Sequence, residues 1–117
     1  MKCVPPTTSP VDLDQMTSTY AFTPELDELA AGLSIWANPT RIRIFALLRD
    51  AEQMCVCDLA KVLGVSVSAV SQNLAKMRAH KFVQYRREAQ TLYYSLSDHP
   101  LNANIRDIVQ RVSDQPA

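Results

Sequence analysis

The chain has 117 residues, of which 47% are hydrophobic and 21% charged, and its formal net charge is zero. This balance is typical of one globular domain with a modest core and excludes a wholly disordered chain. No apolar run approaches the length of a membrane span and no secretory signal is evident, so we expect a cytoplasmic protein without a membrane partner. In that compartment the cysteines are expected to be reduced thiols, free to bind metal or react.

Positive charge gathers in one stretch of this neutral chain. Between residues 76 and 87 there is no acid, and the bases are Lys76, Arg78, Lys81, Arg86 and Arg87. Residues 11–30 carry acids and no base. A local basic stripe favours a DNA-binding face, although a solvated charged surface explains such a stripe about as often when it stands alone.

The predicted elements begin after a segment rich in Pro, Ser, Thr and Asp. Residues 1–22 lack helical periodicity and are expected to form a flexible arm. A first helix is expected to begin at Thr23-Pro24. Its apolar positions recur at helical spacing: Leu26, Leu29, Leu33 and Trp36. A second helix is expected behind Asn38-Pro39, and a break near residues 50–53 should follow it.

Two short helices around Gly64-Val65 have the sequence form of a helix-turn-helix. Gly64 is expected to end the first of them, and Ser66 to cap the second, which should run to about His80. The apolar positions of the first are Leu59, Val62 and Leu63, and those of the second are Val67, Val70, Leu74 and Met77.

Residues 82–85 and 91–96 alternate and are rich in β-branched and aromatic side chains, which predicts a hairpin. A last helix is expected over residues 100–112, with an apolar stripe of Leu101, Ile105, Ile108 and Val112. A partner subunit or the chain's own first helix could cover that stripe. The predicted fold is thus mostly α with a small β-hairpin: a homodimeric winged helix-turn-helix over residues 23–113, with terminal helices that dimerise.

The second helix of a helix-turn-helix enters the major groove of double-stranded DNA. The residues opposite its buried stripe, which should face the operator, are Ser68, Ser71, Gln72, Asn73 and Lys76. Gln and Asn can bond adenine edges, and Ser can bond a base or a phosphate. The residues expected to neutralise phosphates are Lys76, Arg78, Arg86 and Arg87. A polar helix face without any nucleic-acid role is the alternative.

The pair Cys55 and Cys57 is the sharpest chemical signal. Thiolates are soft donors that favour Zn(II), Cd(II), Pb(II), Hg(II), Cu(I) or As(III). On an ideal helix, residues two apart point about 200° apart, so both cysteines can face one ion only if that turn unwinds. The distortion is small if the pair lies at the start of the helix and large if it lies within it. Two buried structural cysteines are the alternative.

Four motifs in order resemble the ArsR/SmtB family of metal-sensing repressors, over about residues 24–112. They are Asn38-Pro39-Thr40-Arg41-Ile42-Arg43-Ile44, Met54-Cys55-Val56-Cys57-Asp58-Leu59-Ala60, Ser66-Val67-Ser68-Ala69-Val70-Ser71-Gln72-Asn73-Leu74 and Tyr93-Tyr94-Ser95-Leu96. The resemblance implies a homodimeric repressor of a resistance or efflux operon that its metal ion releases from DNA.

The same resemblance implies a third thiol ligand. In the arsenic-sensing branch a further cysteine follows the pair, but Ala60 occupies that position here. In the cadmium- and lead-sensing branch the N-terminal arm supplies thiols, and Cys3 is placed for that role, unless it is simply a free thiol. A three-sulfur site favours Pb(II), Hg(II), Bi(III) or As(III) over tetrahedral Cd(II). A second family site on the last helix is expected to be lost, because Arg111 stands at a ligand position.

The hairpin departs from the family at its tip, which reads Arg87-Glu88-Ala89-Gln90 and contains no glycine. Two-residue primed turns need positive φ, which alanine resists. We therefore expect a longer or looser tip.

Two further interpretations stay open at this point. The cysteines could form a thiol redox or persulfide switch on the same DNA-binding fold. A small cysteine enzyme is a distant alternative, because the chain lacks a glycine-rich phosphate loop and would need a cysteine beside His80 or His99.

Overall fold

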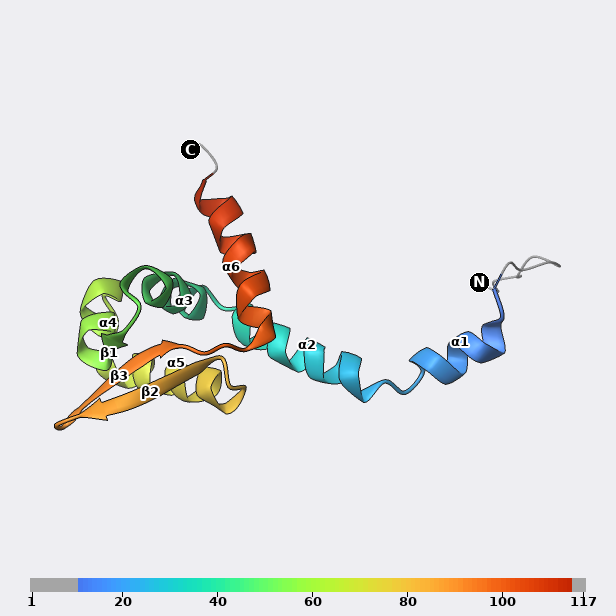
Figure 1. The fold of residues 1–117 in the computed structure, drawn as a ribbon, viewed down its shortest axis with the longest axis horizontal. Coiled ribbons are helices and arrows are strands. Elements are labelled where there is room, and N and C mark those ends of the chain that lie inside the picture. Colours follow the sequence, from blue (N-terminus) through green and yellow to red (C-terminus); the bar gives the residue numbers. More distant parts are fainter. Residues whose placement is uncertain (1–10, 115–117) are drawn as a thin grey trace. The chain divides into compact units, whose positions relative to one another are not determined.

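The computed structural model describes residues 11–114 (Figure 1). Its elements are α1 (Leu13–Tyr20), α2 (Pro24–Trp36), α3 (Pro39–Ala51), β1 (Met54–Cys55), α4 (Val56–Leu63), α5 (Val67–Ala79), β2 (Val83–Glu88), β3 (Thr91–Leu96) and α6 (Pro100–Ser113). The chain forms two compact units that divide between Ala31 and Gly32. The predicted fold class, mostly α with a small antiparallel sheet, is confirmed. No helix within the described range is long and apolar enough to cross a bilayer.

The lack of helical periodicity in residues 1–22 predicts a flexible arm, but Leu13–Tyr20 form helix α1. Its start is fixed by Asp12, whose carboxylate accepts a hydrogen bond from the Gln15 N–H at 3.2 Å. Hydroxyl side chains then bond carbonyls one turn back, as Thr17 does to Leu13 at 2.8 Å. Ser, Thr and Asp residues are typical of helix caps and turns, so the sequence of this segment does not predict a helix.

Helices α2 and α3 begin and end close to their predicted positions. Asn38 caps α3 by accepting from the Arg41 N–H at 3.1 Å, and Pro39 is the first helical residue. The predicted apolar stripe of α2 is only partly buried. Trp36 is in the core, with 4% of its surface exposed. The other three members of that stripe are 40–47% exposed: Leu26, Leu29 and Leu33. They form an exposed apolar stripe on α2.

The core of the second unit is built around aromatic side chains. Trp36 meets Phe45 edge to face at 5.2 Å between ring centroids and Phe82 at 4.8 Å. Such pairs add stability beyond the area they bury. Fully buried aliphatic side chains from three helices complete this core: Ile44, Leu48, Leu59, Val70, Leu74 and Met77.

The helix-turn-helix is confirmed as α4 and α5. Gly64 ends α4 in the left-handed conformation, with φ 68° and ψ 31°, and Ser66 caps α5 by accepting from the Ala69 N–H at 3.0 Å. The predicted burial of Val67 is wrong, because this residue is 48% exposed. Val67 is the first residue of α5, and the buried side of the helix begins only at Val70.

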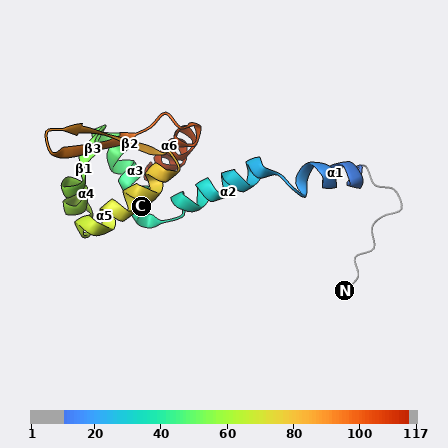
Figure 2. The same cartoon turned by 90° about the horizontal axis from the view of Figure 1, so that it is seen from below.

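The sheet has the antiparallel order β1-β3-β2. Its hairpin projects beyond the helices that pack at its base (Figures 1 and 2). Glu88 pairs with Thr91, so the tip is a two-residue loop, and the expectation of a longer or looser tip is wrong. Ala89 takes φ 56°, a conformation that costs a non-glycine residue about 1–2 kcal/mol and that the paired strands outweigh.

Helix α6 is anchored by polar contacts at its start. His99 caps it through Nδ1, which accepts from the Leu101 N–H at 3.0 Å, as expected of a helix-start residue. The buried Asn102 amide donates to the carbonyls of Phe82 and Ser97, both at 2.9 Å. These bonds hold α6 against the end of the hairpin.

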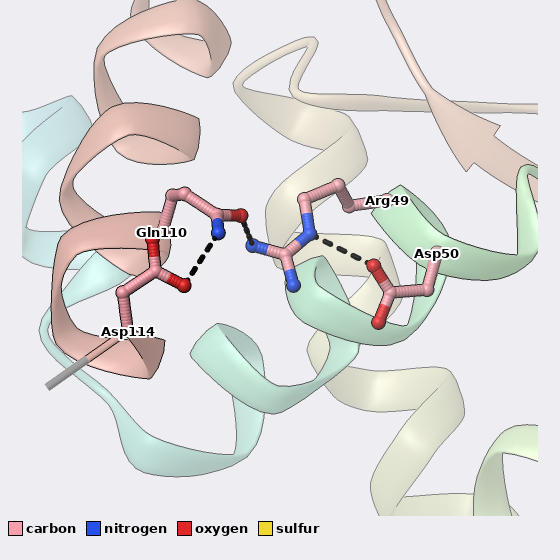
Figure 3. A network of polar contacts seen from close by, with 4 residues as sticks. All are labelled: Arg49, Asp50, Gln110 and Asp114. Atoms are coloured by element: carbon pink, nitrogen blue, oxygen red, sulfur yellow. Dashed lines mark hydrogen bonds and ion pairs between the residues drawn. The ribbon is translucent and has the colours of Figure 1, made fainter. Parts of the chain in front are cut away.

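The other end of α6 is held to α3 by a chain of polar contacts (Figure 3). Arg49 pairs with Asp50 at 3.0 Å and donates to Gln110 Oε1 at 3.4 Å. The predicted stripe of α6 divides between two faces, since Ile105 is buried while Ile108 and Val112 are 56% and 67% exposed. The outer face of α6 is thus a second uncovered apolar surface.

Two valines one turn apart on α5 test this account of its burial. Val70→Ala should lower the free energy of unfolding by about 2 kcal/mol, because it removes two methylene equivalents from the core. Val67→Ala deletes the same atoms from an exposed position and should change stability by no more than about 0.5 kcal/mol. Urea denaturation followed by circular dichroism measures both, and equal losses would contradict the assigned burial.

Candidate DNA interface and thiol pair

The outer face of α5 carries most of the predicted groove-reading residues. Ser68, Ser71, Gln72 and Lys76 are exposed. Gln72 makes one contact within the helix, a 3.4 Å hydrogen bond from Nε2 to Ser68 Oγ. Val67, which was not predicted on this face, adds an exposed apolar side chain at the helix start. Amide, hydroxyl and methyl groups on one helix face are suited to reading base edges and thymine methyl groups.

Asn73 differs from its neighbours, because it is half-buried and both ends of its amide are engaged. Its Oδ1 accepts from Arg41 Nε at 3.0 Å, and its Nδ2 donates to the Ala69 carbonyl at 2.9 Å. The structure therefore ties this predicted base-reading residue to α3. The sequence did not predict this contact with Arg41, because local patterns do not relate residues that lie 32 positions apart.

The predicted phosphate-neutralising side chains are exposed, but two of them have partners within the chain. The Arg78 guanidinium lies 4.4 Å from the centroid of the Tyr85 ring. Arg86 forms a 2.6 Å ion pair with Glu88 and donates to Gln53 at 3.1 Å. Because Glu88 offsets its charge, Arg86 is better suited to fastening the hairpin than to attracting phosphate. Lys76 and Arg87 are exposed on α5 and β2.

The thiols of Cys55 and Cys57 lie outside the core. Cys55 is half-buried and Cys57 is exposed, which removes the alternative of two buried structural cysteines. The flanking side chains Met54 and Val56 pack against the core instead. Cys55 has extended backbone angles, φ −84° and ψ 164°, so the 200° separation expected on an ideal helix does not apply to this pair.

Cys55 is the point at which the sheet becomes a helix. It pairs with Tyr93 of β3 as the last residue of β1, and it is also the N-cap of α4. Its side chain makes no capping hydrogen bond, so the first-turn N–H groups of α4 lack the side-chain acceptor that usually fixes a helix start. The backbone of Cys55 thus belongs both to the sheet and to the start of α4.

Residues 11–114 contain no group of three or more His, Cys, Asp or Glu side chains placed to hold a metal ion. The described part of the chain therefore contributes two thiols at this junction. Cys3, the predicted third ligand, lies outside the described residues.

Together, the helix-turn-helix, the hairpin beside it and the exposed polar face of α5 define a winged-helix DNA-binding protein. The model for bacterial regulatory proteins of the arsR family matches residues 38–85. A transcriptional repressor SmtB homolog from Synechocystis sp. is 35% identical over 107 residues, which cover 89% of this chain and 80% of that protein. The chain therefore belongs to the ArsR family of transcription regulators, and its assignment to DNA binding rather than catalysis follows.

The chain is also similar to family members with other names. The nodulation protein NolR of Rhizobium meliloti is 52% identical over 71 residues, covering 60% of this chain and 57% of NolR. The structure of reduced HlyU from Vibrio cholerae has a TM-score of 0.69 at 34% identity, covering 78% of this chain and 94% of that one. Similarity within the family thus fixes the fold and the class of protein, while the inducing signal has to be argued from this chain's own residues.

Lys76 provides a direct test of the DNA interface. Lys76→Ala should weaken binding to all sequences alike and lower the slope of log K against log salt by about 1, because one phosphate contact is lost. Gln72→Ala should instead reduce discrimination between sequences. Fluorescence anisotropy across salt concentrations, with a duplex selected by the wild-type protein from a random library, measures both effects. An unchanged slope for Lys76→Ala would remove this residue from the interface.

Proposed function

We propose that this protein is a homodimeric transcriptional repressor that binds operator DNA and releases it when a thiophilic ion is captured by Cys55 and Cys57. One observation carries the proposal: two thiols outside the core flank the start of α4, the first helix of the DNA-reading unit. The candidate inducers are As(III), Pb(II), Cd(II), Hg(II) and Zn(II), because thiolate ligands favour such ions over Mg(II) or Ca(II).

The proposed homodimer accounts for the uncovered apolar surfaces. Helix α2 exposes Leu26, Leu29 and Leu33, and α6 exposes Ile108 and Val112. A chain of this size gains stability by burying such surfaces against a second copy. Two copies related by a twofold axis would present two recognition helices to successive major grooves, which suits a palindromic operator.

Ion capture and DNA binding are coupled in this proposal through the backbone at Cys55. To bring both sulfurs to one ion, the residues around Val56 must leave their present path between β1 and α4. Helix α4 packs against α5, and β1 pairs with β3, so the new path changes the position of the recognition helix or of the hairpin. The ion releases DNA to the extent that it binds this second state more tightly.

The number of ligands limits the choice of ion. Two thiolates are too few for selective capture, and Cys3, from the same or the other subunit, is the remaining thiol of the sequence. A three-sulfur site fits Pb(II), Hg(II) or As(III), whereas structural Zn(II) sites are almost always four-coordinate. Within this proposal Cys3 completes the site.

A thiol redox or persulfide sensor is the second candidate, favoured by the absence of a third ligand among residues 11–114. In that case hydrogen peroxide would accept two electrons from the two thiols, giving a disulfide and two water molecules. Alternatively, one thiolate would attack a polysulfide and take up a sulfur atom, giving a persulfide and a polysulfide shorter by one sulfur. Either product would also alter the junction between β1 and α4.

Cys57→Ser and Cys55→Ser should separate sensing from DNA binding. Both variants are expected to bind the selected duplex within about twofold of wild type, because neither thiol is in the core. Neither should lose affinity on ion addition, whereas wild type should lose about 5–150-fold. Anisotropy with each candidate ion, in a phosphine reductant, measures the response. A variant that responds like wild type would show that its cysteine is not part of the sensor.

The two triggers can be told apart with the wild-type protein and one further variant. Release by stoichiometric ion under strong reductant is expected for an ion sensor, with sulfur-to-metal charge-transfer bands that report the number of thiolates. Release only by peroxide or polysulfide, reversed by dithiothreitol, would instead establish the redox switch. Cys3→Ser should weaken ion binding and remove one sulfur from the spectrum. Unchanged ion affinity in this variant would exclude the N-terminal thiol from the site.

A further inference from the structure

The Arg41 side chain, on α3, contacts residues of α2 and α5 that lie in the same compact unit. Its Nε donates to Asn73 Oδ1 of α5 at 3.0 Å, and its Nη1 donates to the Ile35 carbonyl in the last turn of α2 at 3.1 Å. Arg41 itself lies in the first turn of α3, where its backbone N–H is bonded by the Asn38 cap. The side chain is half-buried, so these contacts are partly shielded from water.

The position of Arg41 runs against local helix preferences. It is the third residue of α3, where Glu or Gln would complete a capping box and where the helix dipole disfavours a cation. A residue that breaks a local rule points to a compensating tertiary contact. Here the compensating contact is the hydrogen bond from Arg41 to the Ile35 carbonyl. Helix α2 has no basic residue in its own last turn, so Arg41 provides the positive charge at that helix end.

The Asn73 amide is committed to this arrangement. The bond from Arg41 requires an oxygen and the bond to the Ala69 carbonyl requires an N–H, so both contacts demand the same amide orientation. Bidentate reading of adenine would need that same oxygen and the same amide nitrogen. While the contact with Arg41 stands, Asn73 is better placed to hold α5 than to read a base.

We propose that Arg41 is a positioning residue for DNA recognition, which fixes α5 through Asn73 to the start of α3 and to the last turn of α2. The inference rests on the proposed function and adds a residue that does not touch DNA. Because Leu33 of the proposed dimer surface lies in the same unit as Ile35, the contact relates the angle of each recognition helix to the geometry of the dimer. Loss of the contact lowers the affinity for the correct operator while leaving the general attraction to phosphate intact.

Charge-preserving substitution tests this role. Arg41→Lys keeps the positive charge but loses the planar fork that serves two acceptors at once. It should weaken binding to the selected duplex about tenfold, with little change for a scrambled duplex and no change in salt slope. Arg41→Met should do the same or worse. Arg43→Met removes the same groups from an exposed position on α3 and is expected to stay within about twofold of wild type.

A double-mutant cycle assigns the effect to the contact with Asn73. Asn73→Ala should weaken binding to the selected duplex, and adding it to Arg41→Lys should cost no more than about a further twofold, because the two residues act as one unit. The loss should extend over all positions of the site when single base pairs are varied. Circular dichroism and sedimentation confirm that each variant is a folded dimer, and Arg41→Lys with Asn73→Ala carry the test if Arg41→Met does not fold.

Several results would overturn the inference. Arg41→Lys binding like wild type, multiplicative losses in the cycle, or a loss confined to one base pair would each contradict a positioning role. A salt slope lowered by about 1 in Arg41→Met would make this residue a phosphate contact instead. Failure of the proposed function can be told apart from failure of this inference. A wild-type protein that prefers no duplex from the library would overturn the proposed function and the positioning role together. If the wild-type protein selects a duplex and Arg41→Lys binds it equally well, only the positioning role is overturned.

Discussion

The proposed function depends on Cys55, which is both the last residue of a strand and the N-cap of a helix. At Cys55 the chain leaves its pairing with Tyr93 and enters α4, with Met54 and Val56 held in the core on either side. Cys55 lies between these two core residues and Cys57 follows them, and both cysteines lie outside the core. Because no side chain caps this helix start, no capping bond has to break if the junction rearranges. A sensor placed here needs no separate path to the DNA-reading unit, since it forms the beginning of that unit.

Most of the fold could be predicted because its boundaries are set by local chemistry. Asn38-Pro39, Gly64 and Ser66 act as helix ends in the structure as they do in sequence patterns. The failures have equally local causes. Helix α1 is rich in hydroxyl residues that bond their own backbone, and β1 is two residues long, too short to show any periodicity. The tight turn at Ala89 is enforced by strand pairing against the residue's own preference.

The candidate site likewise contains features that the sequence predicts and one that it does not. Helical spacing correctly predicts that Ser68, Ser71, Gln72 and Lys76 are exposed on α5, while their role and that of the two thiols stay predictions. The bond between Arg41 and Asn73 could not be predicted, because it joins residues 32 positions apart. Membership in the ArsR family establishes a DNA-binding regulator, and its inducing signal is a separate question. In the proposed function, the signal is whatever Cys55 and Cys57 bind.

Hydrogen–deuterium exchange of the dimer, with and without one equivalent of Pb(II) or As(III) per subunit, tests the central claim most directly. Capture of the ion by both sulfurs should speed exchange at the amides of β1 and at the first hydrogen-bonded amides of α4, Leu59 and Ala60, while the buried part of α3 around Phe45 stays protected. An ion-loaded dimer whose exchange over residues 54–60 matches that of the ion-free form would contradict the account, because the proposed coupling requires this junction to move.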